Sequence, residues 1–538
     1  MADKDFLYLR QNIQLEPLID HWYAWSHLIP PATAARNITE RHLKIMDSYI
    51  NSPLIHANAV KNPKMLGGPF IDYGGKRVGE IRELRDRIKR ERAHLLDLSS
   101  AISALDSLLR DSAKGHSLQP LYSQVPEILR GYVELVYDLN NNPSFRIIEP
   151  LLYKSKYYDR SQQSLMLSAI AKDDRPFVLS TPRLESEDAL HLNVPFDDPV
   201  VDELFRLKSI SRPWHEIKEM MQTPDHKDDL LYSFLTSAPP IPYQPYSGPG
   251  VRWRYFGHAC ILIEAQGTSM LFDPVLSYTY ESSISRYTYL DLPEAIDYVL
   301  ITHNHQDHVL FETLLQIRHK VRNIVVPRNG GGALQDPSLK LLLENAGFKN
   351  VIEISEMEQI REGNVCLTGL PFLGEHADLD IKTKMAWLAA IGPHKLLFAA
   401  DSCNVEPKLY EHIQREVGCV DALFLGMECD GAPLTWLYGP LITRPVERSA
   451  DESRRLSGSN CEQGMHIVNA FQCKEAYVYA MGQEPWLNYI MSIKYTDQSR
   501  PIIESNRLIQ ACKEKGIIAE RLFGEKEILM EASSAVMA

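Results

Sequence analysis

The segment 302–308, with the sequence THNHQDH, constrains the fold of this 538-residue chain more than any other feature. It directly follows the apolar run YVLI, which we predict to be a buried β-strand. His303 and His305 are two residues apart, so their side chains lie on one side of the chain and can reach the same metal ion. Asp307 and His308 follow in the turn and can reach a second ion. The segment therefore predicts a two-metal site at the end of a strand.

A stretch rich in proline and glycine divides the chain. Residues 237–250 hold five prolines and two glycines, which neither a helix nor a central strand accommodates. We interpret this stretch as a linker between an N-terminal domain, residues 1–236, and a catalytic domain, residues 251–538. Two domains also suit a chain that is too long for a single hydrophobic core.

The net charge of the chain, −13, argues against nucleic-acid binding, which needs a basic surface. The first thirty residues mix charges into every apolar run, so no signal-peptide core is expected. No stretch approaches the roughly 18 apolar residues that span a bilayer. The eight cysteines all lie from Cys260 onward without CxxC spacing, as expected of reduced thiols. These features predict a cytoplasmic protein that binds neither nucleic acid nor membrane.

The N-terminal domain is predicted to be mixed, with helices in the majority. Residues 79–109 carry apolar side chains at spacings of three, four and seven, which favours one long amphipathic helix. A second helix is expected over residues 125–138. Between residues 144 and 210, the runs FRII and FVLS are typical of strands, and the run DPVVDELFRLK is typical of a helix.

After the linker, short β-rich runs alternate with helical ones, which indicates a layered α/β or α+β fold. The β-rich runs are residues 253–256, 260–264, 269–272, 298–302, 323–327 and 395–399. The helical runs are residues 311–317, 339–346, 408–416, 461–471 and 503–515.

HNHQDH is an instance of the HxHxDH signature, and on this motif the chain resembles the metallo-β-lactamase superfamily. The runs YFGHACILIE and LFDP are similar to the opening strands of that fold. The run LLFAADS is similar to the strand that ends in the bridging aspartate, here Asp401, and His466 stands where the last ligand histidine is expected. The resemblance covers about residues 251–485 and implies an αββα sandwich.

One ligand position departs from the zinc hydrolases of this superfamily. They usually supply a histidine between the HxHxDH motif and the bridging aspartate, whereas the candidates here are Glu375 and His376, both in the run PFLGEHAD. If Glu375 is the ligand, the seven candidate metal ligands comprise four imidazoles and three carboxylates. Hard oxygen ligands suit iron better than zinc. Since zinc has no redox chemistry, a carboxylate here favours oxygen activation over hydrolysis. His376 as the ligand would favour a hydrolase.

The chain resembles one subgroup of the superfamily in three features: the glutamate at this position, the chain length and the separate N-terminal domain. These are the non-haem diiron β-hydroxylases of nonribosomal peptide biosynthesis, which include the chloramphenicol-type amino-acid β-hydroxylases. The ligands that this resemblance implies are His303, His305 and Glu375 for one iron, Asp307, His308 and His466 for the other, and Asp401 as the bridge. Glu428, in the run GMECDGAP, matches a family glutamate near the cluster that tunes the metals or relays a proton. The alternative for Glu428 is an ordinary ion pair with a basic neighbour.

The resemblance implies an enzyme, a diiron monooxygenase that β-hydroxylates an amino acid held as a thioester on a peptidyl carrier domain of a nonribosomal peptide synthetase. The implied cofactors are two iron ions with an oxo or hydroxo bridge, O2 and an external electron donor. The implied partners are the loaded carrier domain, an electron-transfer protein and a second copy of the chain. The N-terminal domain would then dock the carrier domain, dimerise the enzyme or shape the tunnel to the active site. The alternatives are a dizinc hydrolase, such as a lactonase or phosphodiesterase, and a scaffold that has lost its chemistry.

Four further residues have expected places near the site. Asp273 is expected to turn the chain beside the metals and to orient ligand histidines. His258, on an early strand, is expected to be structural. Trp436 and Tyr438 could line a substrate cavity, although aromatic side chains more often fill the core.

Overall fold

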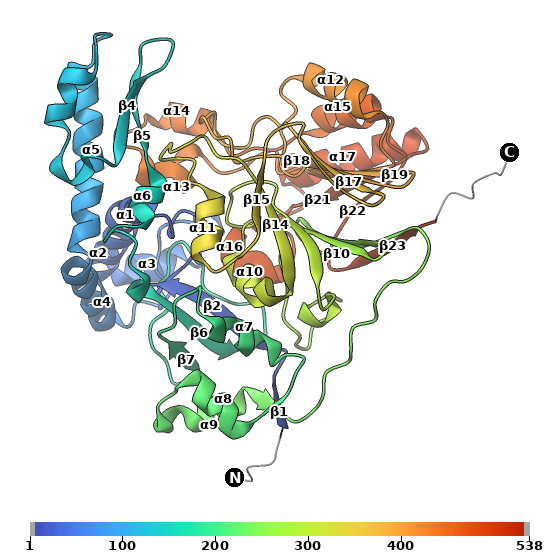
Figure 1. The fold of residues 1–538 in the computed structure, drawn as a ribbon, viewed down its shortest axis with the longest axis horizontal. Helices are drawn as coiled ribbons and strands as arrows, with labels where there is room; N and C mark the ends of the chain where they lie inside the picture. The colour runs from blue at the N-terminus through green and yellow to red at the C-terminus, as the bar shows by residue number, and fades with distance from the viewer. Residues whose placement is uncertain (1–5, 532–538) are drawn as a thin grey trace.

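The computed structural model describes residues 6–531 (Figure 1). The C-terminal part of the chain contains two seven-stranded sheets that pack face to face. The first sheet, in spatial order, consists of β15 (Val351–Ile354), β14 (Val321–Pro327), β13 (Ile296–Leu300), β12 (Thr268–Phe272), β11 (Cys260–Ala265), β10 (Val251–Gly257) and β23 (Lys526–Met530). The second sheet consists of β16 (Gln359–Glu362), β17 (Val365–Leu370), β18 (Ala386–Ile391), β19 (His394–Phe398), β20 (Ala422–Gly426), β21 (Glu475–Tyr479) and β22 (Ile518–Arg521).

Aromatic side chains fill the space between the two sheets. Phe272 of β12 stacks on Phe398 of β19 with ring centroids 3.9 Å apart, and Trp253 of β10 meets Phe424 of β20 edge-on at 5.1 Å. All four rings are buried. Burying a large side chain of this kind stabilises the fold by about 1.5–3 kcal/mol, and the ring pairing adds to that. The alternation of these residues along their strands places them on the inner faces of the sheets.

Helices cover the outer faces of the sandwich. On the second sheet lie α12 (Pro407–Val417), α15 (Cys461–Phe471) and α17 (Arg500–Glu514), which bury their apolar sides in one core with that sheet (Figure 1). On the first sheet lie α10 (Phe311–Ile317) and α11 (Leu339–Asn345). Shorter helices follow in the loops: α13 (Leu434–Tyr438), α14 (Arg448–Ser453) and α16 (Asn488–Met491). The expected αββα sandwich is confirmed.

The N-terminal domain is built on a four-stranded antiparallel sheet in the order β3 (Trp22–Tyr23), β2 (Ile13–Ile19), β6 (Gln163–Ala169) and β7 (Ala189–Leu192). A smaller sheet contains β8 (Arg212–Pro213), β1 (Phe6–Leu9) and β9 (Leu235–Thr236), and a hairpin contains β4 (Val133–Tyr137) and β5 (Pro143–Ile147). The helices are α1 (Pro31–Asn37), α2 (Leu43–Asn51), α3 (Pro53–Ala59), α4 (Val78–Glu91), α5 (Ala93–Ser112), α6 (Glu149–Tyr153), α7 (Pro199–Arg206), α8 (Trp214–Met221) and α9 (Asp228–Ser233). Residues 237–250 contain neither helix nor strand.

The two parts of the chain share a hydrophobic core. Buried side chains of β2 and α1 belong to the same cluster as those of α10 and of the outer face of the first sheet. The N-terminal sheet therefore packs against the helical layer of the catalytic domain, and α10 lies between them (Figure 1). None of the helices in residues 6–531 is both long and apolar enough to cross a bilayer.

Three predictions for the N-terminal domain were wrong. The helix expected over residues 79–109 is two helices, because the chain breaks at Arg92, whose buried guanidinium pairs with Asp20 and Asp159 at 2.9 and 2.8 Å. Residues 125–138 form a short turn and strand β4 instead of a helix, since the run VELVY alternates in burial and pairs with β5. The run FVLS forms no strand.

Candidate metal centre

The side chains that the sequence indicates gather where strands of both sheets end. The segment 301–308 follows β13 of the first sheet, and Asp273 follows the neighbouring strand β12. From the second sheet, Asp401 follows β19 and Glu428 follows β20. Because β12 and β13 run parallel, as do β19 and β20, the carboxyl ends of these strands bring their residues to one edge of the sandwich.

His303, His305 and Glu375 form a first group of buried side chains. Nε2 of His303 lies 3.2 Å from Nδ1 of His305, and this Nδ1 lies 3.1 Å from Oε1 of Glu375. A metal ion where these three atoms converge would be bound by two imidazoles and one carboxylate.

His376, the alternative to Glu375, lies on the other side of the His305 ring. Its Nδ1 is 3.0 Å from Nε2 of His305 and 3.0 Å from the hydroxyl of Tyr438. The opposite nitrogen of His305, Nδ1, is the one that faces His303 and Glu375. The structure therefore groups Glu375, and not His376, with the two motif histidines.

His308 takes part in two further groups. Its Nε2 lies 3.1 Å from Oδ2 of Asp401, and the same carboxylate oxygen lies 3.8 Å from Nε2 of His303. Asp401 thus stands between the first group and His308, where a bridging ligand has to be. The last group consists of His308, Asp307 and His258, and in it Nε2 of His258 lies 3.0 Å from Oδ2 of Asp307.

Asp273 holds two residues of the motif segment, Thr302 and His308, through hydrogen bonds. Its Oδ2 lies 2.7 Å from Nδ1 of His308 and also accepts a hydrogen bond from the hydroxyl of Thr302. The backbone N–H of Thr302 donates to the other carboxylate oxygen at 2.7 Å. A carboxylate in this position keeps the proton on Nδ1 of His308 and leaves Nε2 free for a metal. Asp273 therefore contacts a motif histidine, as expected, and its role in orienting a metal ligand stays a prediction.

Several buried atoms of the centre have no hydrogen-bond partner, which tests whether metals fit here. They include Oε2 of Glu375, Oδ1 of Asp401 and Nδ1 of His258. Each buried polar atom without a partner costs about 1–3 kcal/mol, and a charged one costs more. Cations would satisfy the carboxylate oxygens, and a mixed imidazole and carboxylate donor set suits iron. The residues present therefore fit a pair of iron ions.

The carboxylates of the centre also crowd one another. Burial raises the pKa of Glu375 to about 7, and the neighbouring Asp401 and Asp307 add to the rise. Burial raises the pKa of Glu428 well above its usual value, again with help from Asp401 and Asp307. Although burial also acts to raise the pKa of Asp307, the adjacent His308 brings it below its usual range. Bound cations would relieve this repulsion, since nearby positive charge favours the ionised form of each carboxyl group.

A cavity of about 430 Å³, which we call the inner cavity, opens onto the centre. Glu375, Asp401 and Glu428 line it on the metal side, while Trp436 and Gly67 line it on the side of the N-terminal domain. Nε1 of Trp436 donates a hydrogen bond to the carbonyl of Gly67 at 2.9 Å, so both domains build this wall. Trp436 was a candidate for the wall of a substrate cavity from its residue type, whereas Gly67 lies in no motif that would have identified it.

His466, which was expected to be a ligand, is not brought to the centre. It lies on the exposed side of α15 with Glu462 and Asn469, because the apolar positions of that helix turn toward the second sheet. Instead, His258 lies beside Asp307 and His308, the two motif residues with which His466 was expected to share a metal ion. The assignment of His466 is corrected accordingly. His258, expected to be structural, sits at φ 50° in the hairpin between β10 and β11, which turns its ring toward the motif.

Comparisons with known proteins agree with this architecture. Residues 8–239 match the model of a diiron non-heme beta-hydroxylase N-terminal domain, and residues 268–432 match that of a beta-lactamase superfamily domain. The chain is 40% identical over 521 residues to the 4-amino-L-phenylalanyl-(CmlP-peptidyl-carrier-protein) 3-hydroxylase of Streptomyces venezuelae, which covers 96% of this chain and 98% of the relative. A protein of Pyrococcus abyssi is 28% identical over 122 residues, which is 23% of this chain and 48% of that protein.

The fold also matches a solved structure over nearly its whole length. The crystal structure of CmlA, a diiron beta-hydroxylase from Streptomyces venezuelae, has a TM-score of 0.92 to this chain at 38% sequence identity. The match covers 98% of this chain and 100% of CmlA. With this identity and coverage, the chain belongs to the family of diiron non-haem β-hydroxylases.

Proposed function

We propose that this protein is an O2-dependent diiron monooxygenase that adds a hydroxyl group to Cβ of an amino acid held as a thioester on a peptidyl carrier domain. The observation that carries the proposal is the convergence of Glu375 with His303 and His305, where zinc hydrolases of this fold usually present a histidine. By its name, the Streptomyces venezuelae relative hydroxylates an aminoacyl group on a carrier protein. A dizinc hydrolase is not favoured, because it would need His376 as a ligand and His376 faces Tyr438.

The ring nitrogens that face one another support a specific pair of ligand sets. We assign His303, His305 and Glu375 to the first iron, Asp307, His308 and His258 to the second, and Asp401 to the bridge. His303 and His308 would bind through Nε2, and His305 through Nδ1, because these nitrogens face the other ligands. Bound iron supplies the redox chemistry by which one atom of O2 enters a C–H bond.

The balance of the reaction explains the need for an electron donor. One substrate molecule, one O2, two electrons and two protons give the hydroxylated amino acid and one water. The substrate supplies none of these two electrons, so we propose an electron-transfer partner. Glu428 lines the inner cavity beside Asp401 and Tyr495, and we propose that this carboxyl group holds a proton next to the bound substrate.

A second cavity provides space for the phosphopantetheine arm on which a carrier domain holds the amino acid. This outer cavity, of about 550 Å³, shares Gly67, Pro433 and Trp436 with the inner cavity. Phe177 lines the outer cavity, and Lys44 lies at it with a largely exposed side chain. A phosphopantetheine arm has an extended chain with a phosphate at its outer end. We propose that the arm lies in the outer cavity and that the aminoacyl group reaches the inner one.

We propose roles for the parts of the chain on the same basis. Residues 1–236 would dock the carrier domain and contribute to a homodimer, 237–250 would link the domains, and 251–538 would hold the diiron centre. Strand β23, near the C-terminal end, pairs with β10 at the edge of the first sheet. This pairing supports a catalytic domain that extends from residue 251 to the C-terminal end. All eight cysteines are free, which suits the reducing cytoplasm where we propose that the enzyme works.

The test is an oxygen-transfer assay with loaded carrier domains. Full-length protein reconstituted with ferrous iron is given O2, a chemical reductant and a panel of aminoacyl-carrier proteins. The expected product is one aminoacyl group that gains a single oxygen atom from labelled O2, while the same free amino acid reacts far more slowly. Hydrolysis of a lactone or phosphodiester, with no oxygen gain on any loaded carrier, would overturn the proposal.

A further inference from the structure

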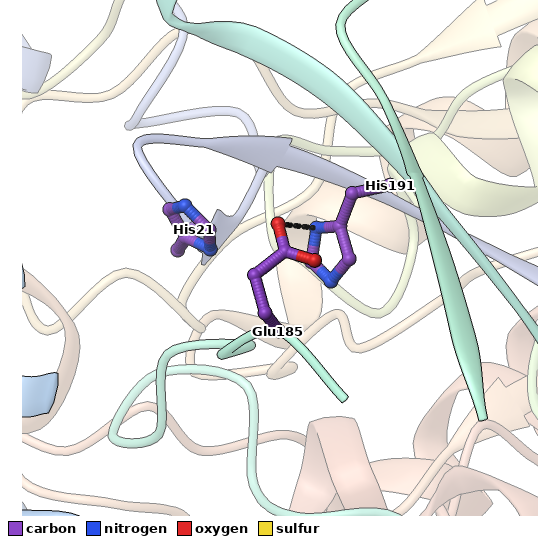
Figure 2. A group of neighbouring side chains, drawn as sticks. All are labelled: His21, Glu185 and His191. Carbon is purple, nitrogen blue, oxygen red and sulfur yellow. Dashed lines mark ion pairs between the residues drawn. The ribbon is translucent and has the colours of Figure 1, made fainter. Parts of the chain in front are cut away.

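A second cluster of metal-binding side chains lies in the N-terminal domain, away from the diiron centre. His21 comes from the turn between β2 and β3, Glu185 from the loop before β7, and His191 from β7 itself. Figure 2 shows the three side chains converging, with the carboxylate of Glu185 between the two rings. One ligand atom from each lies within 4.8 Å of the other two. None of the three residues takes part in the assigned iron ligands.

His191 is buried without a satisfying partner. Its side chain is 8% exposed, and its Nε2 has no hydrogen-bond partner. Nδ1 lies 3.7 Å from Oε1 of Glu185, which is too long for a hydrogen bond. Leaving a buried polar group in this state costs about 1–3 kcal/mol. A ligand that accepts the lone pair of an imidazole would remove this cost.

His21 is oriented in the way that metal-bound histidines are. Its Nδ1 lies 2.7 Å from the backbone carbonyl of Arg183 and must carry a proton in order to donate to that oxygen. Nε2 is then left with its lone pair free, which is the arrangement that binds metals. Arg183 is itself fixed by a buried ion pair with Glu16, so the carbonyl is held in place.

The charges around the cluster permit a cation. Burial lowers the pKa of His21, and it lowers the pKa of His191 to about 4, so both rings are neutral at physiological pH. Among neighbouring groups, Arg87 and Lys227 are positive and Glu185 is negative, while Asp20 is already paired with Arg92. Two neutral imidazoles and one carboxylate match the three protein ligands of many zinc sites.

We propose that His21, Glu185 and His191 form a third metal site in each chain, which takes a zinc-class divalent cation with water as the fourth ligand. Tetrahedral zinc places ligand atoms about 3.3 Å apart, so the cluster has to contract. The Glu185 side chain is 63% exposed and can swing inward to close it. The bound ion would tie the turn after β2 to β7 and to the loop before it, which strengthens the sheet on which the N-terminal domain is built.

The test measures a metal in addition to iron. Iron-loaded full-length protein is incubated with Zn²⁺, freed of loosely bound metal and analysed for both elements, and its thermal unfolding is recorded with and without Zn²⁺. The variants are Glu185→Gln, which changes an exposed side chain, and His191→Gln. Glu187→Gln is the matched control, since Glu187 is exposed in the same loop and is not part of the cluster.

The expected result is one zinc beyond the two irons in the wild type and in Glu187→Gln, with a rise in Tm on addition of Zn²⁺. Glu185→Gln and His191→Gln should bind at least tenfold more weakly and lose the zinc-dependent rise. Iron content should be unchanged throughout. A wild type that retains no zinc would overturn the site, as would a Glu185→Gln protein that retains as much zinc as the wild type.

Discussion

Arg175 of the N-terminal domain forms a bidentate ion pair with Glu312 of helix α10, with Nη1–Oε1 and Nη2–Oε2 distances of 3.0 and 2.7 Å. Both side chains are almost completely buried, and the hydroxyl of Tyr23 donates a further hydrogen bond to Glu312 at 2.8 Å. The guanidinium lies 3.5 Å from the ring centroid of Tyr489 and also pairs with Glu16. The two domains are therefore joined by a charged network inside their shared core as well as by apolar contact.

Removing one partner of this network should destabilise the protein strongly. Arg175→Met leaves the carboxylate of Glu312 buried without its counter-charge, which typically costs about 3–5 kcal/mol. The midpoint of urea unfolding should fall accordingly. Lys172→Met is the control, because Lys172 is 76% exposed and its pair with Asp174 is worth about 0–1 kcal/mol. If the two variants unfold at the same urea concentration, the buried ion pairs do not stabilise the contact between the domains.

The same network predicts a specific loss of stability in acid. Although burial acts to raise the pKa of Glu16, Arg183 and Arg175 bring it down from 4.5 to about 2. A carboxyl group with a lowered folded-state pKa stabilises the protein fully above 4.5, and this stabilisation disappears as the pH falls toward 2. The Tm of the wild type should exceed that of Glu16→Gln at neutral pH, and the two values should converge between pH 4.5 and 2. A difference that stays constant over this range would show that the charge of Glu16 does not matter.

Two histidines provide a matched test of the second iron site. His258→Ala should lower the affinity for the second iron by at least about 10- to 100-fold, because it removes a proposed ligand and the loss of even an outer-shell partner typically costs that much. His466→Ala should retain both irons and full hydroxylation, since His466 is exposed on α15. Iron analysis of the two purified variants checks this. Loss of iron in His466→Ala together with its retention in His258→Ala would restore the ligand set first expected from the sequence.

Glu428→Gln should separate proton transfer from metal binding. The substitution keeps the shape of the side chain but removes its ability to hold and release a proton, so hydroxylation should slow by about 10²- to 10⁴-fold while both irons remain. Asp430→Asn is the control, since Asp430 also lines the inner cavity but is exposed at its rim. If Glu428→Gln loses an iron, Glu428 is a ligand rather than a proton carrier. If its rate is unchanged, the residue has neither role.

Local sequence patterns were sufficient for much of the catalytic domain. The helix expected over residues 311–317 matches α10, and the one expected over 461–471 matches α15, because each has an apolar face of regular period that the sheet buries. His303, His305, Asp307 and His308 are adjacent in the chain, so their convergence required only the strand and the turn that follow from the motif.

Long-range contacts explain what the sequence could not show. His258 reaches Asp307 only because β10 and β11 form a hairpin beside β12 and β13, and a single histidine in a strand-rich run gives no sign of this. His466 has the residue type and the order along the chain expected of a ligand, but the helical phase of α15 turns it outward. In the N-terminal domain, the pairing of β2 with β6 joins segments about 150 residues apart, beyond the reach of any local pattern.

We propose that Glu375 makes this a diiron centre, and metal content with an optical spectrum tests this most directly. The wild type should contain about two irons per chain and show near-ultraviolet absorption from an oxygen bridge between ferric ions. Glu375→His should lose hydroxylation even if it still binds two metals, because the carboxylate of the first group is replaced by an imidazole. A colourless wild-type protein with stoichiometric zinc, active only as a hydrolase, would contradict a diiron centre.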